Sequence, residues 1–250
     1  MHKFFVPQNY IDNKEALIEG EDVKHIYKVL RLKVEDEIII NNLQGKEYLG
    51  QIKAIDKKEV RVELIKELDI NNESHIKIHL YQGLPKSSKM DLIVQKGTEL
   101  GISSITPVVT NRVVVQNQLG EFKKLDRWQR IALEAAKQSK RTLIPYINSP
   151  IDFHQLKIQL ENMDLIVVPY ENADNYGIKN MIGRIAKDKI KEIAIIIGPE
   201  GGFEEEEISA LKNLEAHIVT LGPRILRTET AGFVCSAIVQ YELGDTGGDL

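Results

Sequence analysis

Two glycine-containing loops carry the residues best suited to holding a small ligand. Residues 198–203 read GPEGGF and residues 221–231 read LGPRILRTETA, and each loop follows an apolar run. Glycine permits positive φ and lets the bare backbone approach a ligand closely. A loop such as GPEGG can also be a tight connection between a strand and a helix, and for that loop alone the connection is the commoner case.

The residues after GPEGGF narrow the class of ligand. Four consecutive glutamates, residues 204–207, begin the next expected helix, where their carboxylates complement the positive helix end and repel a phosphate. The chain contains neither of the phosphate-binding patterns GxxxxGKS/T and GxGxxG. The sequence therefore favours a ligand that contains adenosine and no phosphate, held by backbone donors and acceptors.

The sequence gives little support for a metal site or for a catalytic nucleophile. His75 and His79 are the closest pair of histidines, but they lie in a strand-like segment without a third ligand, so we expect two exposed strand side chains. The single cysteine, Cys235, lies in an apolar stretch, where we expect it to be buried as a small hydrophobic side chain. No arrangement of serine, histidine and acid with a recognisable nucleophile elbow is present. The sequence predicts no metal site.

Positive charge is concentrated in the middle of an acidic chain. The 250 residues carry a formal net charge of −4, which argues against binding of nucleic acid through bulk charge. Residues 84–150 nevertheless contain eleven Lys and Arg against five Asp and Glu. The helix expected within them has an apolar stripe in which Trp128 should pack into the core. The cations that recur at three-four spacing on its other face are Lys123, Arg127, Arg130, Lys137 and, at the end, Arg141. Either a nucleic-acid surface or an ordinary solvated face explains them.

The elements that would position these residues fall into two parts. Residues 37–42, 47–55 and 59–68 read as β-strands separated by turns, which predicts a small antiparallel barrel or meander. The apolar pattern lapses near residue 73, where we expect a domain boundary. Beyond it, strands alternate with helices, which predicts a mostly parallel sheet covered on both faces. Such sheets bind ligands beyond the carboxyl ends of their strands, where both glycine-containing loops fall.

The alternation in the second part can be assigned element by element. The expected strands are residues 76–84, 104–109, 164–170, 192–199 and 217–222, and the expected helices are residues 88–101, 122–140, 178–187, 204–214 and 230–243. Residues 245–250 form a polar tail that we expect to fray. No apolar run approaches the thickness of a bilayer, and the first residues lack the pattern of a secretory signal, so we expect a cytosolic location.

Five sequence blocks in a fixed order resemble the RsmE family of 16S ribosomal RNA uridine-N3 methyltransferases, members of the SPOUT class. The blocks are residues 25–31 (HIYKVLR), 95–101 (QKGTELG), 134–141 (EAAKQSKR), 197–202 (IGPEGG) and 221–231 (LGPRILRTETA). The resemblance covers nearly the whole chain, and the five blocks together are far more specific than any one of them. Departures from the family pattern are Lys3 in place of arginine and Gly97 in place of alanine.

The resemblance implies the architecture of the whole chain. It implies an α/β fold with an N-terminal PUA-like β-barrel over residues 1–72 and a C-terminal SPOUT-type domain with a trefoil knot over residues 73–244. Residues 245–250 form the tail after this domain. The resemblance also implies a homodimer whose active sites lie near the interface. Knots are so rare that sequence patterns alone would not suggest one.

The resemblance also implies the ligands and the residues that hold them. S-adenosylmethionine in a bent form is the implied cofactor, with no metal. The residues implied to bind it are Ile197, Gly198, Pro199, Glu200, Gly201, Leu221, Gly222, Ile225, Leu226, Arg227, Thr230 and Ala231. The implied substrate is a specific uridine of 16S ribosomal RNA in the small ribosomal subunit, methylated at N3. The residues expected to contact this RNA are Lys3, His25, Arg31, Arg127, Arg130, Lys137 and Arg141.

Methyl transfer from a sulfonium requires alignment of donor and acceptor and removal of the N3 proton from a weakly acidic imide. We expect Arg227 to stabilise the negative charge that gathers on O2 and O4 of the base. Glu229 is expected either to accept the proton or to cap the start of the last helix. Two alternatives stay open. One is a SPOUT enzyme that methylates a ribose 2′-hydroxyl, and the other is a ribosome-assembly factor that binds RNA without catalysis.

Overall fold

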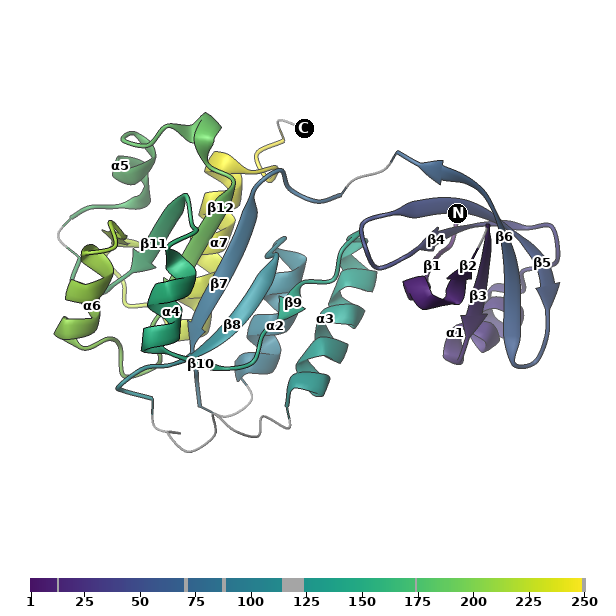
Figure 1. Cartoon of the computed structure of the whole chain (residues 1–250), viewed down its shortest axis with the longest axis horizontal. Coiled ribbons are helices and arrows are strands. Elements are labelled where there is room, and N and C mark those ends of the chain that lie inside the picture. Colours follow the sequence, from purple (N-terminus) through teal and green to yellow (C-terminus); the bar gives the residue numbers. More distant parts are fainter. Residues whose placement is uncertain (13, 70–71, 87–88, 114–123, 174, 249–250) are drawn as a thin grey trace. The chain divides into compact units, whose positions relative to one another are not determined.

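The computed structural model describes residues 1–12, 14–69, 72–86, 89–113, 124–173 and 175–248 (Figure 1). It divides the chain into two compact units. The first consists of Met1–Glu73 with Lys140–Ile144, and the second of Ser74–Ser139 with Pro145–Leu250. The first unit thus includes a short return of the chain, of which the sequence pattern carried no sign.

The first unit is built on a six-stranded sheet in which antiparallel pairs predominate. Its order is β1 (Lys3–Phe5), β4 (Glu37–Asn41), β5 (Glu47–Ile55), β6 (Glu59–Leu68), β3 (Glu15–Glu19) and β2 (Ile11–Asp12). Val60, Val62 and Leu64 are buried on β6 because successive side chains of a strand point to opposite faces. The three predicted strands are confirmed, whereas β1, β2 and β3 were missed.

A π-helix interrupts the strands of the first unit. The 3-10 turn η1 (Gln8–Tyr10) precedes β2, and α1 (Glu21–Lys24) leads directly into the π-helix η2 (His25–Leu30). Arg31 ends the π-helix with a left-handed φ of 54°. π-Helical turns are rare in proteins, and those that occur often lie at functional sites. This one contains most of the HIYKVLR block.

The second unit contains a sheet whose described strand pairs are all parallel. Its order is β10 (Ile151–Asp152), β8 (Ser104–Val109), β7 (Lys77–Gly83), β12 (Glu192–Ile197), β11 (Leu165–Pro169) and β13 (His217–Val219), and β9 (Tyr146–Ile147) pairs with β8. The helical elements are α2 (Lys89–Glu99), α3 (Leu125–Ser139), α4 (Phe153–Leu160), α5 (Ile178–Ile182), η3 (Lys187–Lys189), α6 (Glu205–Lys212) and α7 (Thr228–Leu243). The predicted alternation of strands and helices is confirmed, but α4, β9 and β10 were missed. None of the described helices is long and apolar enough to cross a membrane.

Helices cover both faces of the parallel sheet (Figure 1). On one face, Leu156 of α4 and Leu211 of α6 share a core with Ile196 of β12. On the other face α7 packs over β7 and β12, where Gly232 approaches the side chain of Leu80. Burying one large aliphatic side chain stabilises a fold by about 1.5–3 kcal/mol. These two cores hold the carboxyl ends of the strands in a fixed arrangement.

Two glycines fix the loop after β12 against the sheet. A Cβ atom on Gly83, at the end of β7, would lie 2.4 Å from the backbone nitrogen of Pro199. Only glycine allows so close an approach. Gly202 adopts a φ of 71°, a conformation that L side chains rarely adopt, and its N–H donates to the Pro199 carbonyl over 2.9 Å. The loop is therefore a tight turn seated on the carboxyl edge of the sheet.

Candidate active site

The two glycine-containing loops meet at the carboxyl ends of β11, β12 and β13, where they line two neighbouring cavities. Cavity A has a volume of about 340 Å³ and is lined by Lys89, Pro169, Glu171, Ile197, Gly198, Pro199, Glu200, Gly202, Phe203, Ile225, Leu226, Arg227, Thr228 and Ala231. Cavity B has a volume of about 440 Å³ and is lined by Pro169, Tyr170, Glu171, Ala173, Asn175, Thr220, Leu221, Gly222, Pro223, Arg224, Ile225, Leu226 and Ala231. The structure thus brings together loops that are some twenty residues apart in the chain.

Most residues predicted to bind the cofactor line these cavities. They are Ile197, Gly198, Pro199, Glu200 and Arg227 in Cavity A, Leu221 and Gly222 in Cavity B, and Ile225, Leu226 and Ala231 in both. Gly201 and Thr230 line neither cavity. The sequence missed Pro169 and Glu171, although the apolar strand before them was a usable signal. It also missed Lys89, which no pattern marked.

Hydrogen bonds from buried side chains hold the first loop to the helix after the second loop. The Thr228 hydroxyl donates to the Gly198 carbonyl over 2.6 Å, and the Gln82 side-chain amide donates to Thr228 Oγ1 over 2.8 Å. Gln82 is fully buried at the end of β7. Hydrogen bonds therefore join three separate segments of the chain at the wall of Cavity A.

Arg112 clamps the outer side of the GPEGG loop. Its guanidinium donates to the Gly201 carbonyl over 3.0 Å and to both carboxylate oxygens of Glu204 over 2.8 and 3.0 Å. The hydrogen bond to Glu204 raises the pKa of Arg112, and the same bond lowers the pKa of Glu204. A Cβ atom on Gly201 would lie 3.1 Å from Cβ of Arg112. The structure therefore packs Gly201 closely against Arg112, and the cofactor contact expected of Gly201 stays a prediction.

Lys89 joins two carboxylates at the wall of Cavity A. Its ammonium lies 2.9 Å from Glu200 Oε1 and 3.3 Å from Glu229 Oε2. The hydrogen bond to Glu200 raises the pKa of Lys89. Burial acts to raise the pKa of Glu200, but the hydrogen bond from Lys89 and the backbone N–H of Lys86 outweigh it and leave that pKa below its usual value. Both partners are therefore held in their charged forms.

Arg227 and Glu229 occupy different environments at the start of α7. Arg227 is exposed, lines Cavity A and is the N-cap residue, with φ −66° and ψ 153°. Glu229 is 9% exposed and does not line the cavity. It lies in the first helical turn, where a carboxylate complements the helix dipole, but it does not cap the helix by a hydrogen bond. Lys89, not Glu229, presents its charged group at the cavity wall.

The expectation that His79 is an exposed strand side chain is wrong. Its Nδ1 lies 2.7 Å from Ser104 Oγ, and its Nε2 lies 2.6 Å from Oε2 of Glu192. The other carboxylate oxygen of Glu192, Oε1, binds Lys77. Parallel register places His79 beside Ser104, so this row of side chains joins three strands at their amino ends, away from the cavities. Among the described residues, no group of three or more His, Cys, Asp or Glu side chains could hold a metal ion.

The buried position predicted for Cys235 is confirmed. Its side chain is fully buried in α7, and burial raises the pKa of the thiol to about 12. A thiol with so high a pKa remains protonated near neutral pH and is a poor nucleophile.

In the first unit, two of the four residues predicted to bind RNA are exposed. His25 and Arg31 lie at the two ends of the π-helix and are exposed. Lys3 instead forms an ion pair with the buried carboxylate of Glu47, and its side chain is 16% exposed. Arg141 is 5% exposed and binds Glu73, with Nη2 2.6 Å from Oε2. The left-handed φ of 59° at the preceding lysine ends α3, so Arg141 leaves the helix and does not extend its cationic face.

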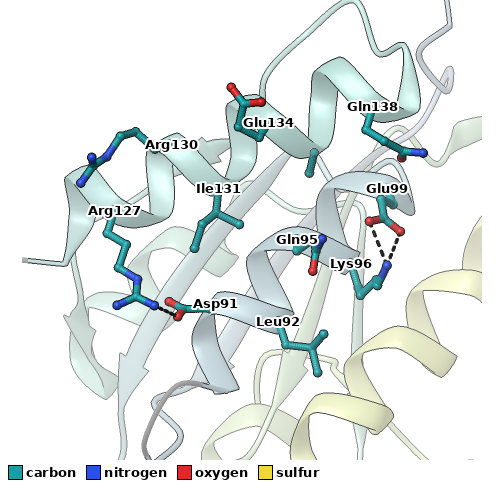
Figure 2. Close-up of a pocket in the computed structure, with 11 residues that line it drawn as sticks. Asp91, Leu92, Gln95, Lys96, Glu99, Arg127, Arg130, Ile131, Glu134 and Gln138 are labelled. Carbon is teal, nitrogen blue, oxygen red and sulfur yellow. Dashed lines mark hydrogen bonds and ion pairs between the residues drawn. The ribbon is translucent and has the colours of Figure 1, made fainter.

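The remaining predicted cations lie on α3, beside a groove that α3 forms with α2, except for Lys123, which lies outside the described residues. This α2–α3 groove has a volume of about 1010 Å³ (Figure 2). Arg127 and Arg130 line it, and Arg127 forms an ion pair with Asp91 of α2. The buried Trp128 donates its indole N–H to the same carboxylate over 3.1 Å, which confirms its predicted core position. Lys137 lies 3.4 Å from Glu134, so the cationic face is partly neutralised.

Comparison with known proteins identifies both units. An RNA methyltransferase domain model matches residues 72–240, and an RNA methyltransferase PUA domain model matches residues 18–65. The chain is 34% identical over 255 aligned residues to the ribosomal RNA small subunit methyltransferase E of Bacillus subtilis, with all of each chain covered. It is 33% identical to the enzyme of the same name from Aquifex aeolicus, covering 92% of this chain and 95% of that one.

Two solved structures share this fold over nearly their whole length. A ribosomal RNA small subunit methyltransferase E from Neisseria gonorrhoeae, bound to S-adenosyl methionine, has a TM-score of 0.79 and 30% identity, covering 98% of this chain and 99% of that one. A putative methyltransferase from Legionella pneumophila in complex with the cofactor has a TM-score of 0.79 and 31% identity, covering 97% and 98%. These matches confirm the predicted PUA-like and α/β architecture. The chain therefore belongs to the RNA methyltransferase family, in the group of ribosomal RNA small subunit methyltransferases E.

Proposed function

We propose that this protein transfers the methyl group of S-adenosylmethionine to N3 of a uridine in the 16S ribosomal RNA of the small ribosomal subunit. The observation that carries the proposal is the pair of cavities at the carboxyl ends of β11, β12 and β13. Full-length relatives named for small-subunit ribosomal RNA, and a neighbour of the same name bound to S-adenosyl methionine, support it. A protein that acts on this substrate would work in the cytoplasm.

The residues around the cavities suit this cofactor. Gly198, Gly202 and Gly222 expose bare backbone to the two cavities. Glu171 and Glu200 line Cavity A beside Lys89 and Arg227, so carboxylates that attract the positive sulfonium stand next to cations that attract the cofactor's carboxylate. Ile225, Leu226 and other apolar side chains offer surface for an adenine ring. When bound, S-adenosylmethionine supplies an electrophilic methyl group.

The charged residues of Cavity A would act on the target base. Loss of the N3 proton places negative charge on O2 and O4, and cations preorganised at the cavity wall stabilise that charge. Arg227 and Lys89 both line the cavity and fit this role. Glu229 stays a candidate for the proton acceptor. Because its Oε2 lies 3.3 Å from Lys89 Nζ, its second candidate role is to hold the ammonium of that lysine in place.

RNA contacts are proposed on both units. Arg127, Arg130 and Lys137 on α3, and His25 and Arg31 at the π-helix, are the residues we assign to RNA. The trefoil knot, the SPOUT classification and the homodimer with active sites near its interface are part of the same proposal. They rest on the sequence resemblance.

A transfer assay in vitro tests the proposed product. Small subunits from cells that lack this protein are incubated with it and labelled S-adenosylmethionine, and the nucleosides are separated after nuclease digestion. The proposal predicts label in N3-methyluridine. Label in 2′-O-methyluridine would favour a ribose methyltransferase, and absence of label in any nucleoside would favour an assembly factor without catalysis.

A further inference from the structure

Cavities A and B share five lining residues, and one of them differs chemically from the rest. The shared residues are Pro169, Glu171, Ile225, Leu226 and Ala231. Four of these have apolar side chains, so Glu171 supplies the polar group at the junction of the cavities. It follows directly after Tyr170 at the carboxyl end of β11.

The carboxylate of Glu171 is available to a ligand. Its side chain is exposed and forms neither a hydrogen bond nor an ion pair with any other residue in the described part of the chain. Its Oε1 lies 3.1 Å from the position that a Cβ atom on Gly202 would occupy, so the missing side chain leaves the carboxylate uncovered. The nearby guanidinium of Arg112 is already engaged by Glu204 and the Gly201 carbonyl.

The two cavities differ in charge. Cavity A has Lys89, Glu200 and Arg227 in its wall, which suits the charged amino-acid end of S-adenosylmethionine and the reacting methyl group. Cavity B is lined mostly by uncharged residues, and apart from Glu171 its one charged lining residue is Arg224. It suits an adenine ring. The ribose joins these two parts of the cofactor and would therefore lie at the junction.

We infer that Glu171 binds the 2′- and 3′-hydroxyl groups of the cofactor ribose. This inference rests on the proposed placement of S-adenosylmethionine in Cavities A and B. A carboxylate has two oxygens that can each accept a hydrogen bond, and neighbouring ribose hydroxyls provide two matching donors. Hydrogen bonds to a charged acceptor are stronger than those between neutral groups. Glu171 would thus select a ribonucleoside donor over its deoxy analogues.

Calorimetric titration of S-adenosylhomocysteine and its 2′-deoxy and 3′-deoxy analogues tests this inference. For the unmodified protein, removing either hydroxyl should weaken binding. The substitution Glu171→Gln should weaken binding of S-adenosylhomocysteine roughly 10- to 100-fold. The same substitution should change the affinity for the deoxy analogues much less, because the interaction is already lost. Glu206→Gln is the matched control, since it removes an exposed carboxylate that lines neither cavity.

Two further measurements separate the possible failures. Ala231→Leu fills a position shared by both cavities and should abolish binding if the cofactor lies there. Loss of binding in Ala231→Leu with unchanged affinity in Glu171→Gln would overturn the role of Glu171 alone. Unchanged affinity in both would overturn the placement of the cofactor. If Glu171→Gln weakened S-adenosylhomocysteine but not methylthioadenosine, Glu171 would bind the amino-acid end, which also overturns the ribose assignment.

Discussion

At the residue scale, the environment of Lys89 changes the interpretation of the carboxylate predicted to act as a base. Glu229 is nearly buried and does not line Cavity A, but its Oε2 lies 3.3 Å from the ammonium of Lys89, which does. A buried carboxylate needs a partner because an unpaired buried charge is costly. Lys89 provides that partner, and Glu229 in turn fixes the position of the ammonium. Sequence reasoning could not find this pair, because the two residues are 140 positions apart in the chain.

Arg227 is the residue with the most direct predicted effect on chemistry. Arg227→Ala should lower the single-turnover rate of methylation on small subunits by about a hundredfold or more, as expected for loss of one charge-stabilising donor. Its effect on cofactor affinity should be much smaller.

Glu229→Gln separates the two candidate roles of Glu229, proton acceptor and partner of Lys89, since an amide cannot accept the proton. A large loss of rate at ordinary stability supports a base, whereas a small one supports a positioning role.

Lys89 should affect the rate more than cofactor binding. Lys89→Met removes the ammonium at the cavity wall and should lower the single-turnover rate by about tenfold to a hundredfold. Lys89→Arg keeps the charge and should retain most of the rate. Because the methionine variant leaves Glu229 unpaired, the double variant Lys89→Met with Glu229→Gln serves as a stability control. Equal rates for the two single Lys89 variants and the unmodified protein would remove Lys89 from the mechanism.

At the element scale, long helices and strands with a regular apolar pattern could be predicted from the sequence. Close contacts between backbone segments could not. Apolar runs and their periods predicted β5, β6, β8 and α7 with ends within a few residues of those observed. The approach of Gly83 to Pro199 and the π-helix depend on tertiary contacts, which leave no local pattern. The candidate site was predictable where loops follow apolar strands, and the contribution of α2 through Lys89 was not.

The cations on α3 are predicted to bind ribosomal RNA as one surface of the helix. Arg130 forms no ion pair with the described residues, unlike Arg127 and Lys137, so it gives the cleanest substitution. Arg130→Gln should weaken binding of ribosomal RNA and reduce the magnitude of its log–log salt slope by about one, as for loss of one phosphate contact. Cofactor affinity should be unchanged. Lys212→Gln on α6 is a control of equal charge, and an unaltered slope for Arg130→Gln would leave α3 as an ordinary solvated face.

At the scale of the whole molecule, the positive excess in residues 84–150 does not become one uniformly basic surface. Several of its cations pair with acids from outside the segment, as Arg112 does with Glu204 and Lys89 does with Glu200. Arg141 is buried against Glu73. A charge count along the chain cannot foresee these pairs, because it compares only sequence neighbours. Two of these cations, Lys89 and Arg112, instead brace the GPEGG loop beside Cavity A.

The central claim is that this protein methylates N3 of a uridine in 16S ribosomal RNA. Mass spectrometry of 16S ribosomal RNA from cells with and without the protein tests it most directly. The account predicts that one N3-methyluridine disappears when the protein is absent. It should return with the unmodified protein but not with Arg227→Ala expressed at the same level. Unchanged N3-methyluridine in cells without the protein, or loss of a 2′-O-methyluridine in its place, would contradict the account.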